Sequence, residues 1–200
     1  MTNVTLLPNE MDLINNEEII LTKNTIINKL IEYLGEIQKA QSQKLEKNKK
    51  EFPPEILSIH PKISKGENYK GLPWLVLDHP RYFRKNNVLA IRTMFWWGKF
   101  FSTTLHLSGI YKMKYAEKIA GNHIILSNNN FFISTGKSEW EHHFENSNYI
   151  PVKGLSAEEF KSKVSETDFV KISSCLPILP LDKLEISLLG DYETLLSCIA

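Results

Sequence analysis

VLAIRTMFWWGKFFSTTLHL, residues 88–107, is the stretch that decides the predicted fold. β-Branched and aromatic residues dominate both of its halves, as they do in β-strands. Gly98 lies between the halves and can adopt the positive φ that a tight hairpin turn requires. We therefore predict two antiparallel strands, 88–96 and 100–107, joined through residues 97–99.

The turn also predicts which residues face each other across this hairpin. If residues 97–98 form the turn, Arg92 lies opposite Thr103, and Met94 lies opposite Phe101 on the same face of the sheet. The predicted hairpin thus carries a positive charge within an otherwise apolar strand.

Arg92 needs a partner in this position, because stripping water from an unpaired charge costs several kcal/mol. An ion pair with Asp78, or with an acid of the C-terminal region, is the first interpretation. The alternatives are an anionic ligand bound in a pocket and exposure to solvent on an edge strand. The sequence leaves these three interpretations open.

The rest of the chain predicts shorter elements around the hairpin. Apolar residues at 3.6-residue spacing predict an amphipathic helix that begins at Thr22 or Asn24, weakens after Ala40 and ends before Pro53. Further helices are expected at 110–120 and 156–164, and further strands at 74–78, 122–126, 130–134, 140–144 and 169–173. Residues 1–16 are expected to be loosely ordered, and residues 181–200 fit neither period.

These elements together predict an α+β fold rather than an α/β fold. A mostly antiparallel sheet, with the hairpin 88–107 at its centre, would be packed by the N-terminal amphipathic helix and by shorter helices. We expect an N-terminal helical segment over residues 1–50 and a single α+β domain over residues 51–200.

Composition argues against several classes of protein. The chain of 200 residues has a net charge of +1, whereas nucleic-acid-binding proteins usually carry a basic excess. No stretch reaches the roughly 18 uncharged apolar residues of a membrane span, and the N-terminus lacks a signal-peptide pattern. Cys175 and Cys198 form no CxxC motif and fit a reducing compartment. We expect a cytoplasmic protein that binds neither nucleic acid nor membrane.

Candidate binding residues gather in the stretch that contains the hairpin. The chain has three arginines, all within a dozen residues, while lysine supplies its other cationic side chains. A Lys- and Asn-rich composition is typical of an AT-rich genome, in which lysine is the usual cationic residue. An arginine in such a sequence is more often required for its two parallel hydrogen bonds to a carboxylate or phosphate. Arg81 and Arg92 are therefore anion-binding candidates, with Trp74, Trp96 and Trp97 as the apolar wall of a pocket.

The candidates for acid or base catalysis lie in the same stretch. Asp78 and His79 lie at the end of the predicted strand 74–78, where active-site groups are often placed. The same residues also form turns readily, because an Asp before x-Pro can bond to the turn backbone. His106, on the second strand of the hairpin, is the other candidate acid or base.

The segment EWEHHFE, residues 139–145, resembles a metal-binding sequence only superficially. As a strand it would alternate a solvated face with a packed face, and its spacing is not HExxH. The sequence also lacks GxSxG, P-loop and GxGxxG motifs. We therefore predict no metal site and no cofactor.

Three functions remain open. The first is a non-catalytic protein that binds a small anionic molecule or a partner protein through an aromatic-walled pocket on strands 74–106. The second is a small hydrolase or transferase that uses His79 or His106 with Asp78, so the sequence does not decide whether this is an enzyme. The third is a structural partner that forms a homodimer through its N-terminal helix. The stretches 67–83 and 95–109 give the impression of a bacterial protein.

Overall fold

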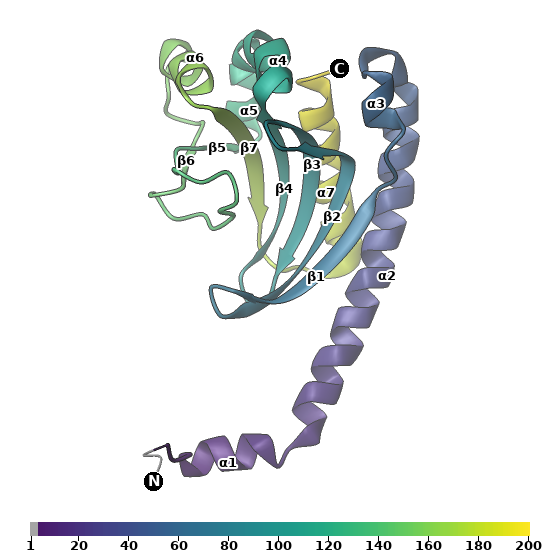
Figure 1. The fold of residues 1–200 in the computed structure, drawn as a ribbon, viewed down its shortest axis with the longest axis vertical. Helices are drawn as coiled ribbons and strands as arrows, with labels where there is room; N and C mark the ends of the chain where they lie inside the picture. The colour runs from purple at the N-terminus through teal and green to yellow at the C-terminus, as the bar shows by residue number, and fades with distance from the viewer. Residues whose placement is uncertain (1–3) are drawn as a thin grey trace.

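The predicted hairpin lies at the centre of a larger antiparallel sheet (Figure 1). The computed structural model describes residues 4–200, and in this range seven strands follow the order β1-β2-β3-β4-β7-β5-β6. The strands are β1 (Lys62–Tyr69), β2 (Leu72–Arg84), β3 (Asn87–Trp96), β4 (Phe100–Ser108), β5 (Phe132–Ser134), β6 (Tyr149–Pro151) and β7 (Phe169–Leu176). The predicted α+β class is confirmed.

Helices surround this sheet on one face and at one end. They are α1 (Pro8–Ile14), α2 (Glu17–Lys47), α3 (Pro54–Leu57), α4 (Gly109–Gly121), α5 (His123–Asn128), α6 (Ala157–Glu166) and α7 (Leu181–Ser197), with a 3₁₀ turn η1 (Lys49–Glu51) after α2. Along residues 4–200, none of these helices combines the length and apolarity that a bilayer crossing requires.

The hairpin has the predicted strands but not the predicted register. The turn contains three residues, 97–99, and the backbone N–H of Lys99 donates to the carbonyl of Trp96 at 3.0 Å. Arg92 therefore lies opposite Thr104. The prediction that Arg92 faces Thr103 was wrong, because one more residue in the turn shifts the pairing by one position and moves the opposing side chains to the other face.

The two faces of the sheet differ in what covers them. On one face, which we call the helix face, Leu75, Leu77, Phe95 and Phe101 pack against buried residues of α2 and α7. The opposite face, which we call the loop face, packs against the irregular segment 135–148. In Figure 1, α7 lies behind the strands on the helix face.

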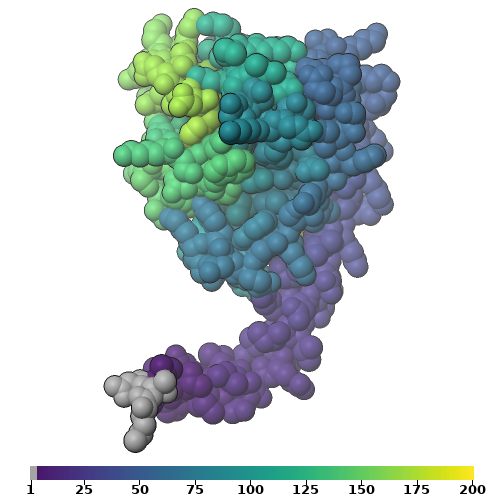
Figure 2. All heavy atoms as spheres, in the orientation of Figure 1, coloured from purple at the N-terminus to yellow at the C-terminus, as the bar shows by residue number. Residues whose placement is uncertain are grey.

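The amphipathic helix packs on the sheet as predicted but is longer than predicted. α2 begins at Glu17, where the Asn16 side chain accepts a hydrogen bond from the Glu18 N–H at 3.1 Å. The first buried residue of α2 is Ile27, so the turns before it lie outside the apolar stripe from which the helix was predicted. Figures 1 and 2 show α1 and the first turns of α2 extending away from the sheet.

Several shorter predictions were wrong. Residues 123–126 belong to helix α5, in which only Leu126 is buried while Ile124 and Ile125 are exposed. Residues 140–144 form no strand. Residues 181–197, which fit neither period in the sequence, form α7. Residues 78–80 do not end a strand, because β2 continues through them with a bulge between Asp78 and Arg81 that accommodates the proline.

His79, at this bulge, contacts α2 rather than solvent. Its Nε2 lies 3.0 Å from Oγ of Ser42, whose hydroxyl donates to the carbonyl of Gln38. The Ser42 oxygen therefore accepts the Nε2–H of a neutral His79, and the buried Nδ1 has no hydrogen-bond partner within residues 4–200. Burial lowers the pKa of His79 from 6.5 to about 4, because a charged ring would be desolvated here.

We expect His79 to destabilise the fold as the pH falls from 6.5 to 4. The unfolded chain binds a proton at His79 in this range and the folded chain does not, so stability falls with pH by up to about 3 kcal/mol. Urea unfolding of His79→Gln should therefore show a weaker loss of stability than the wild type over this range. His60→Gln, at an exposed side chain, is the control and should keep the full loss. An unchanged pH dependence in His79→Gln would contradict this assignment.

Candidate functional site

Polar side chains form a row across four strands on the loop face. Asp78, Arg92, Thr104 and Ser173 are successive partners in β2, β3, β4 and β7. Thr104 and Ser173 lie 2.6 Å apart, hydroxyl to hydroxyl. The helix face is packed mainly by apolar side chains, whereas the loop face carries this polar row. The loop face is therefore the candidate for a functional site.

Arg92 and Asp78 form a two-pronged ion pair. Nε of Arg92 donates to Oδ1 of Asp78 at 2.7 Å, and Nη2 donates to Oδ2 at 2.9 Å. Both side chains are mostly buried, with 17% and 8% of their areas exposed. Arg92 also donates from Nη1 to Nε2 of His142 at 3.1 Å, so His142 is an acceptor at this nitrogen. The interpretation of Arg92 as the partner of Asp78 agrees with this geometry.

A second pair lies one row further along the sheet. Nε2 of His106 is 2.8 Å from Oε2 of Glu139. Burial, followed by the nearby charges of Lys171 and Arg92, lowers the pKa of His106 to about 3, whereas burial raises the pKa of Glu139. Neutral His106 therefore donates its Nε2–H to the Glu139 carboxylate near neutral pH. The partner of His106 is Glu139 and not Asp78.

Lys171 lies directly opposite His106 on the neighbouring strand and is 1% exposed. Its ammonium donates to the backbone carbonyl of Glu141 and lies 5.3 Å from the ring centroid of Tyr149, and it makes no salt bridge within residues 4–200. Burial, with a smaller contribution from Arg92, lowers the pKa of Lys171 to about 7. Burial is also the main cause that lowers the pKa of His142 well below its ordinary value.

Tyr69 attaches the segment 135–148 to the sheet. Its phenolic oxygen accepts hydrogen bonds from the backbone N–H groups of His142 at 2.6 Å and His143 at 3.2 Å. The same hydroxyl lies 3.1 Å from Nδ1 of His143 and donates to it. One phenol thus fixes two successive residues of an irregular segment, and this positions the His142 ring beside Arg92.

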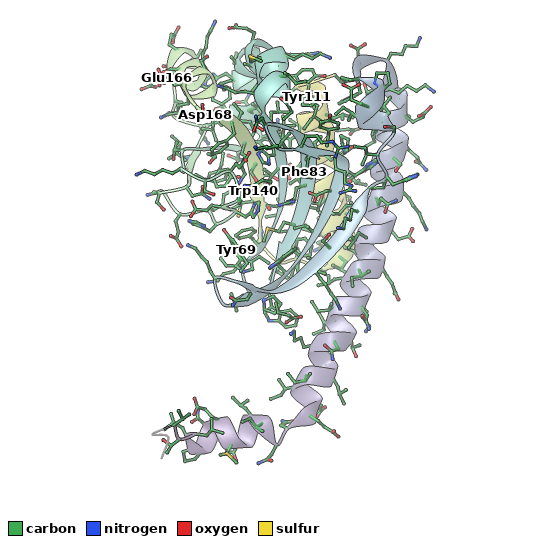
Figure 3. All side chains as sticks on the ribbon, in the orientation of Figure 1. Tyr69, Phe83, Tyr111, Trp140, Glu166 and Asp168 are labelled. Atoms are coloured by element: carbon green, nitrogen blue, oxygen red, sulfur yellow. The ribbon has the colours of Figure 1, made fainter. Side chains whose placement is uncertain are left out.

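Two cavities lie on this face, separated by Trp140. The first has a volume of about 260 Å³, and we call it the Arg92 cavity. It is lined by Asn68, Tyr69, Trp74, Val76, Arg92, Met94, Trp140 and His142. The second, which we call the Glu139 cavity, has about 790 Å³ and includes Ser108, Glu139, Trp140, Glu166 and Asp168 in its lining. Figure 3 shows Trp140 between Tyr69 of the first cavity and Asp168 of the second.

The structure brings some of the predicted binding residues together. Trp74 and Arg92 line the same cavity. Trp96 lies behind its wall, where its Nε1 donates to the carbonyl of Tyr69 at 3.1 Å and the two rings pack edge to face. The Trp74 ring lies on Gly66, where a Cβ would be only 2.5 Å from the ring atoms, so a glycine at this position gives the ring its room.

Other predicted residues lie elsewhere. Nε of Arg81 donates to the carbonyl of His60 at 2.9 Å, and Arg81 lines neither cavity. Trp97 lies on the helix face against Phe95. His79 contacts α2, so the three residues Asp78, His79 and His106 do not converge.

Sequence reasoning missed much of this site. Tyr69, Trp140 and Lys171 were not candidates, and the segment containing Glu139 and His142 was expected to be a strand. Lys171 had a detectable signal, because a lysine within the apolar strand sequence FVKISS needs the same explanation as Arg92. The irregular path of 135–148 had none, since it depends on the distant phenol of Tyr69.

Compared with known proteins, the chain matches no family model, no curated protein and no solved structure. Over residues 4–200, no group of three or more His, Cys, Asp or Glu side chains is arranged to hold a metal ion. The site is therefore interpreted from its own geometry, as a small aromatic-walled cavity beside a buried ion pair.

Replacing Tyr69 by Phe should release the segment 135–148 from the sheet. The amides of His142 and His143 would lose their acceptor, at a cost of about 1–3 kcal/mol for each donor that stays buried. We expect hydrogen exchange in this segment, followed by mass spectrometry, to become at least about tenfold faster. Tyr33→Phe removes a phenol that donates to the carbonyl of Leu181 and serves as the matched control. Equal protection of 135–148 in both variants would rule out the anchoring role.

Proposed function

We propose that this chain is a non-catalytic binding protein that holds a small ligand in the Arg92 cavity. The ligand would combine a planar apolar part with a carboxylate or a similar acceptor group. The observation that carries the proposal is the cavity itself, in which an arginine lies among the aromatic side chains of Tyr69, Trp74 and Trp140. Ligand sites are typically apolar with a few polar groups at fixed positions.

The donor groups of Arg92 support the choice of an acceptor ligand. A guanidinium has five N–H donors. Two bond to Asp78 and one bonds to His142, which leaves two for a ligand. Asp78 offsets the positive charge of Arg92 and also fixes the direction of its planar group. The site is therefore suited to directional hydrogen bonding more than to strong attraction of any anion.

The buried charges around the cavity support a functional role. Buried ion pairs seldom stabilise a fold more than apolar residues of the same size would. This face nevertheless holds Arg92 mostly buried beside the buried Asp78 and Lys171, with two histidines whose pKa values are strongly lowered. Clusters of perturbed ionisable groups in a hollow are characteristic of functional sites.

The size of the cavity sets the size of the probe. Its volume of about 260 Å³ lies just below the ~300–1,000 Å³ of common small-molecule pockets. Benzoate is a suitable probe because it is planar, small and carries one carboxylate. Benzamide has the same shape without the charge, so the pair separates the contribution of the carboxylate from that of the ring.

We expect benzoate to bind about tenfold more tightly than benzamide, because hydrogen bonds to a charged acceptor are worth about 1.5–3 kcal/mol. Both would be titrated into ¹⁵N-labelled protein and followed by NMR, with the indole signal of Trp74 as a local reporter. Trp74→Ala should weaken both probes, and Trp97→Ala should not, because Trp97 lies outside the cavity. Equal affinities for the two probes would refute the preference for a carboxylate, and the absence of saturable shifts would refute the binding site.

A hydrolase or transferase is the second candidate, and one contact favours it. Glu139 lines the larger cavity and its carboxylate is oriented by His106 at 2.8 Å. Glu139, rather than His79 or Asp78, would then be the acid or base. Chemical conversion of a bound molecule, lost in Glu139→Gln while binding persists, would distinguish this candidate from a pure binding protein.

We also propose a cytoplasmic location. Cys175 and Cys198 are both free thiols, which supports a reducing compartment. The bacterial source stays a prediction from the stretches 67–83 and 95–109.

A further inference from the structure

The N-terminal arm, residues 4–26, exposes many apolar side chains. No residue of α1 is buried, and burial in α2 begins only at Ile27. The large apolar residues of the arm that are exposed are Val4, Leu6, Leu7, Met11, Leu13, Ile14, Ile19, Ile20, Leu21 and Ile26. Scattered exposed apolar residues are ordinary, but a continuous series of this kind marks an interaction surface.

An apolar groove adjoins the base of the arm, and we call it the Trp97 groove. It is lined mainly by Ile26, Leu30, Trp97, Ile178 and Leu181. A second hollow, which also contains Trp97 and Ile26, continues it along α2. Figures 1 and 2 show α1 standing clear of the sheet, so the arm does not fill the groove of its own chain.

The exposed area indicates how much surface is left to bury. The accessible surface is 11400 Å², whereas a compact monomer of 23.1 kDa has about 9,700 Å². The excess of about 1,700 Å² is larger than the ~800 Å² that each partner buries in a standard interface. The arm and the groove therefore offer enough surface for a stable complex.

Charge identifies the kind of partner. The arm contains four acids, Glu10, Asp12, Glu17 and Glu18, and one basic residue, Lys23, which gives it a net charge of −3. The remaining chain holds 23 basic and 19 acidic residues, a net charge of +4. An anionic lipid surface would repel the arm. The positively charged remainder of another copy would attract the arm. Lys99 and Lys183 come one and two residues after the groove residues Gly98 and Leu181, so positive charge lies near the groove.

A short helix without a partner also needs an explanation. α1 has seven residues, and isolated helices shorter than about 12–15 residues are marginal in water. Packing against another surface would supply the stabilisation that α1 lacks within its own chain.

We infer that the arm binds a second copy of this chain, and that each arm covers the Trp97 groove of the other copy. Arm and groove meet at Ile26, so a two-fold axis near this residue would bury both surfaces twice in a closed, isologous dimer. The acids of each arm would then lie beside the lysines of the partner, which fixes the direction in which the arm docks. The Arg92 cavity lies on the loop face and takes no part in this contact.

The association is tested by sedimentation equilibrium of the full chain at about 50 µM, above the roughly micromolar limit expected for such interfaces. The wild type should have twice the chain mass of 23.1 kDa, and Ile14→Asp/Ile20→Asp should have the single-chain mass. Met113→Asp/Ile186→Asp is the matched control, since both side chains are exposed outside the arm, and it should stay dimeric. A monomeric wild type, or a dimeric arm variant, would overturn the inference.

Mixing variants tests the arrangement of the two copies. Ile178→Asp alters the groove at an exposed residue and should also give a monomer. An equimolar mixture of this variant with the arm variant should regain a heterodimer, because one intact arm then meets one intact groove. Full dimerisation of Ile178→Asp alone would contradict the proposed contact and would point to pairing between the arms. Wild-type chains that stay monomeric but bind phosphatidylserine vesicles would replace the second copy by a membrane.

Discussion

The guanidinium of Arg92 and the carboxylate of Asp78 face each other across β2 and β3, with both side chains largely removed from water. Neither charge can move away from the other without losing two hydrogen bonds in a medium that does not replace them. The pair therefore fixes the register of two central strands, just before the bulge that allows β2 to continue past Pro80. The ion pair also fixes the plane of the guanidinium group that donates to His142. It thereby helps to position the segment 135–148, which covers the loop face.

The neighbouring ionisable groups adjust to this pair. Arg92 stays charged, so positive charge on Lys171, His106 or His142 is disfavoured both by burial and by repulsion. The result is one permanent ion pair surrounded by groups that hold their protons weakly. Neutral groups of this kind can donate and accept hydrogen bonds to a ligand. Binding then does not require further charged side chains to lose their hydration.

The sequence was sufficient for the central hairpin, the antiparallel sheet and the helix that packs on it, because periodicity and turn residues report on local structure. The register failed by one position, since the number of residues in the turn 97–99 is not encoded by Gly98 alone. α5 was mistaken for a strand because its β-branched residues face solvent rather than a sheet. Only part of the site could be predicted. Arg92 and Trp74 could be identified because each lies within a predicted strand. Tyr69 and His142 could not, because they are 73 residues apart in sequence and meet only in the folded chain.

The tryptophans show why a cluster in sequence need not be a cluster in space. Trp96 ends β3 and Trp97 begins the turn, and the two rings lie on opposite faces of the sheet, so they cannot line the same pocket. Trp96 packs on Tyr69 behind the Arg92 cavity, while Trp97 contacts Phe95 and forms part of the apolar groove on the helix face. The hairpin therefore contributes to two surfaces at once. A ligand site on one face and a contact between copies on the other can use the same two strands without competing for the same side chains.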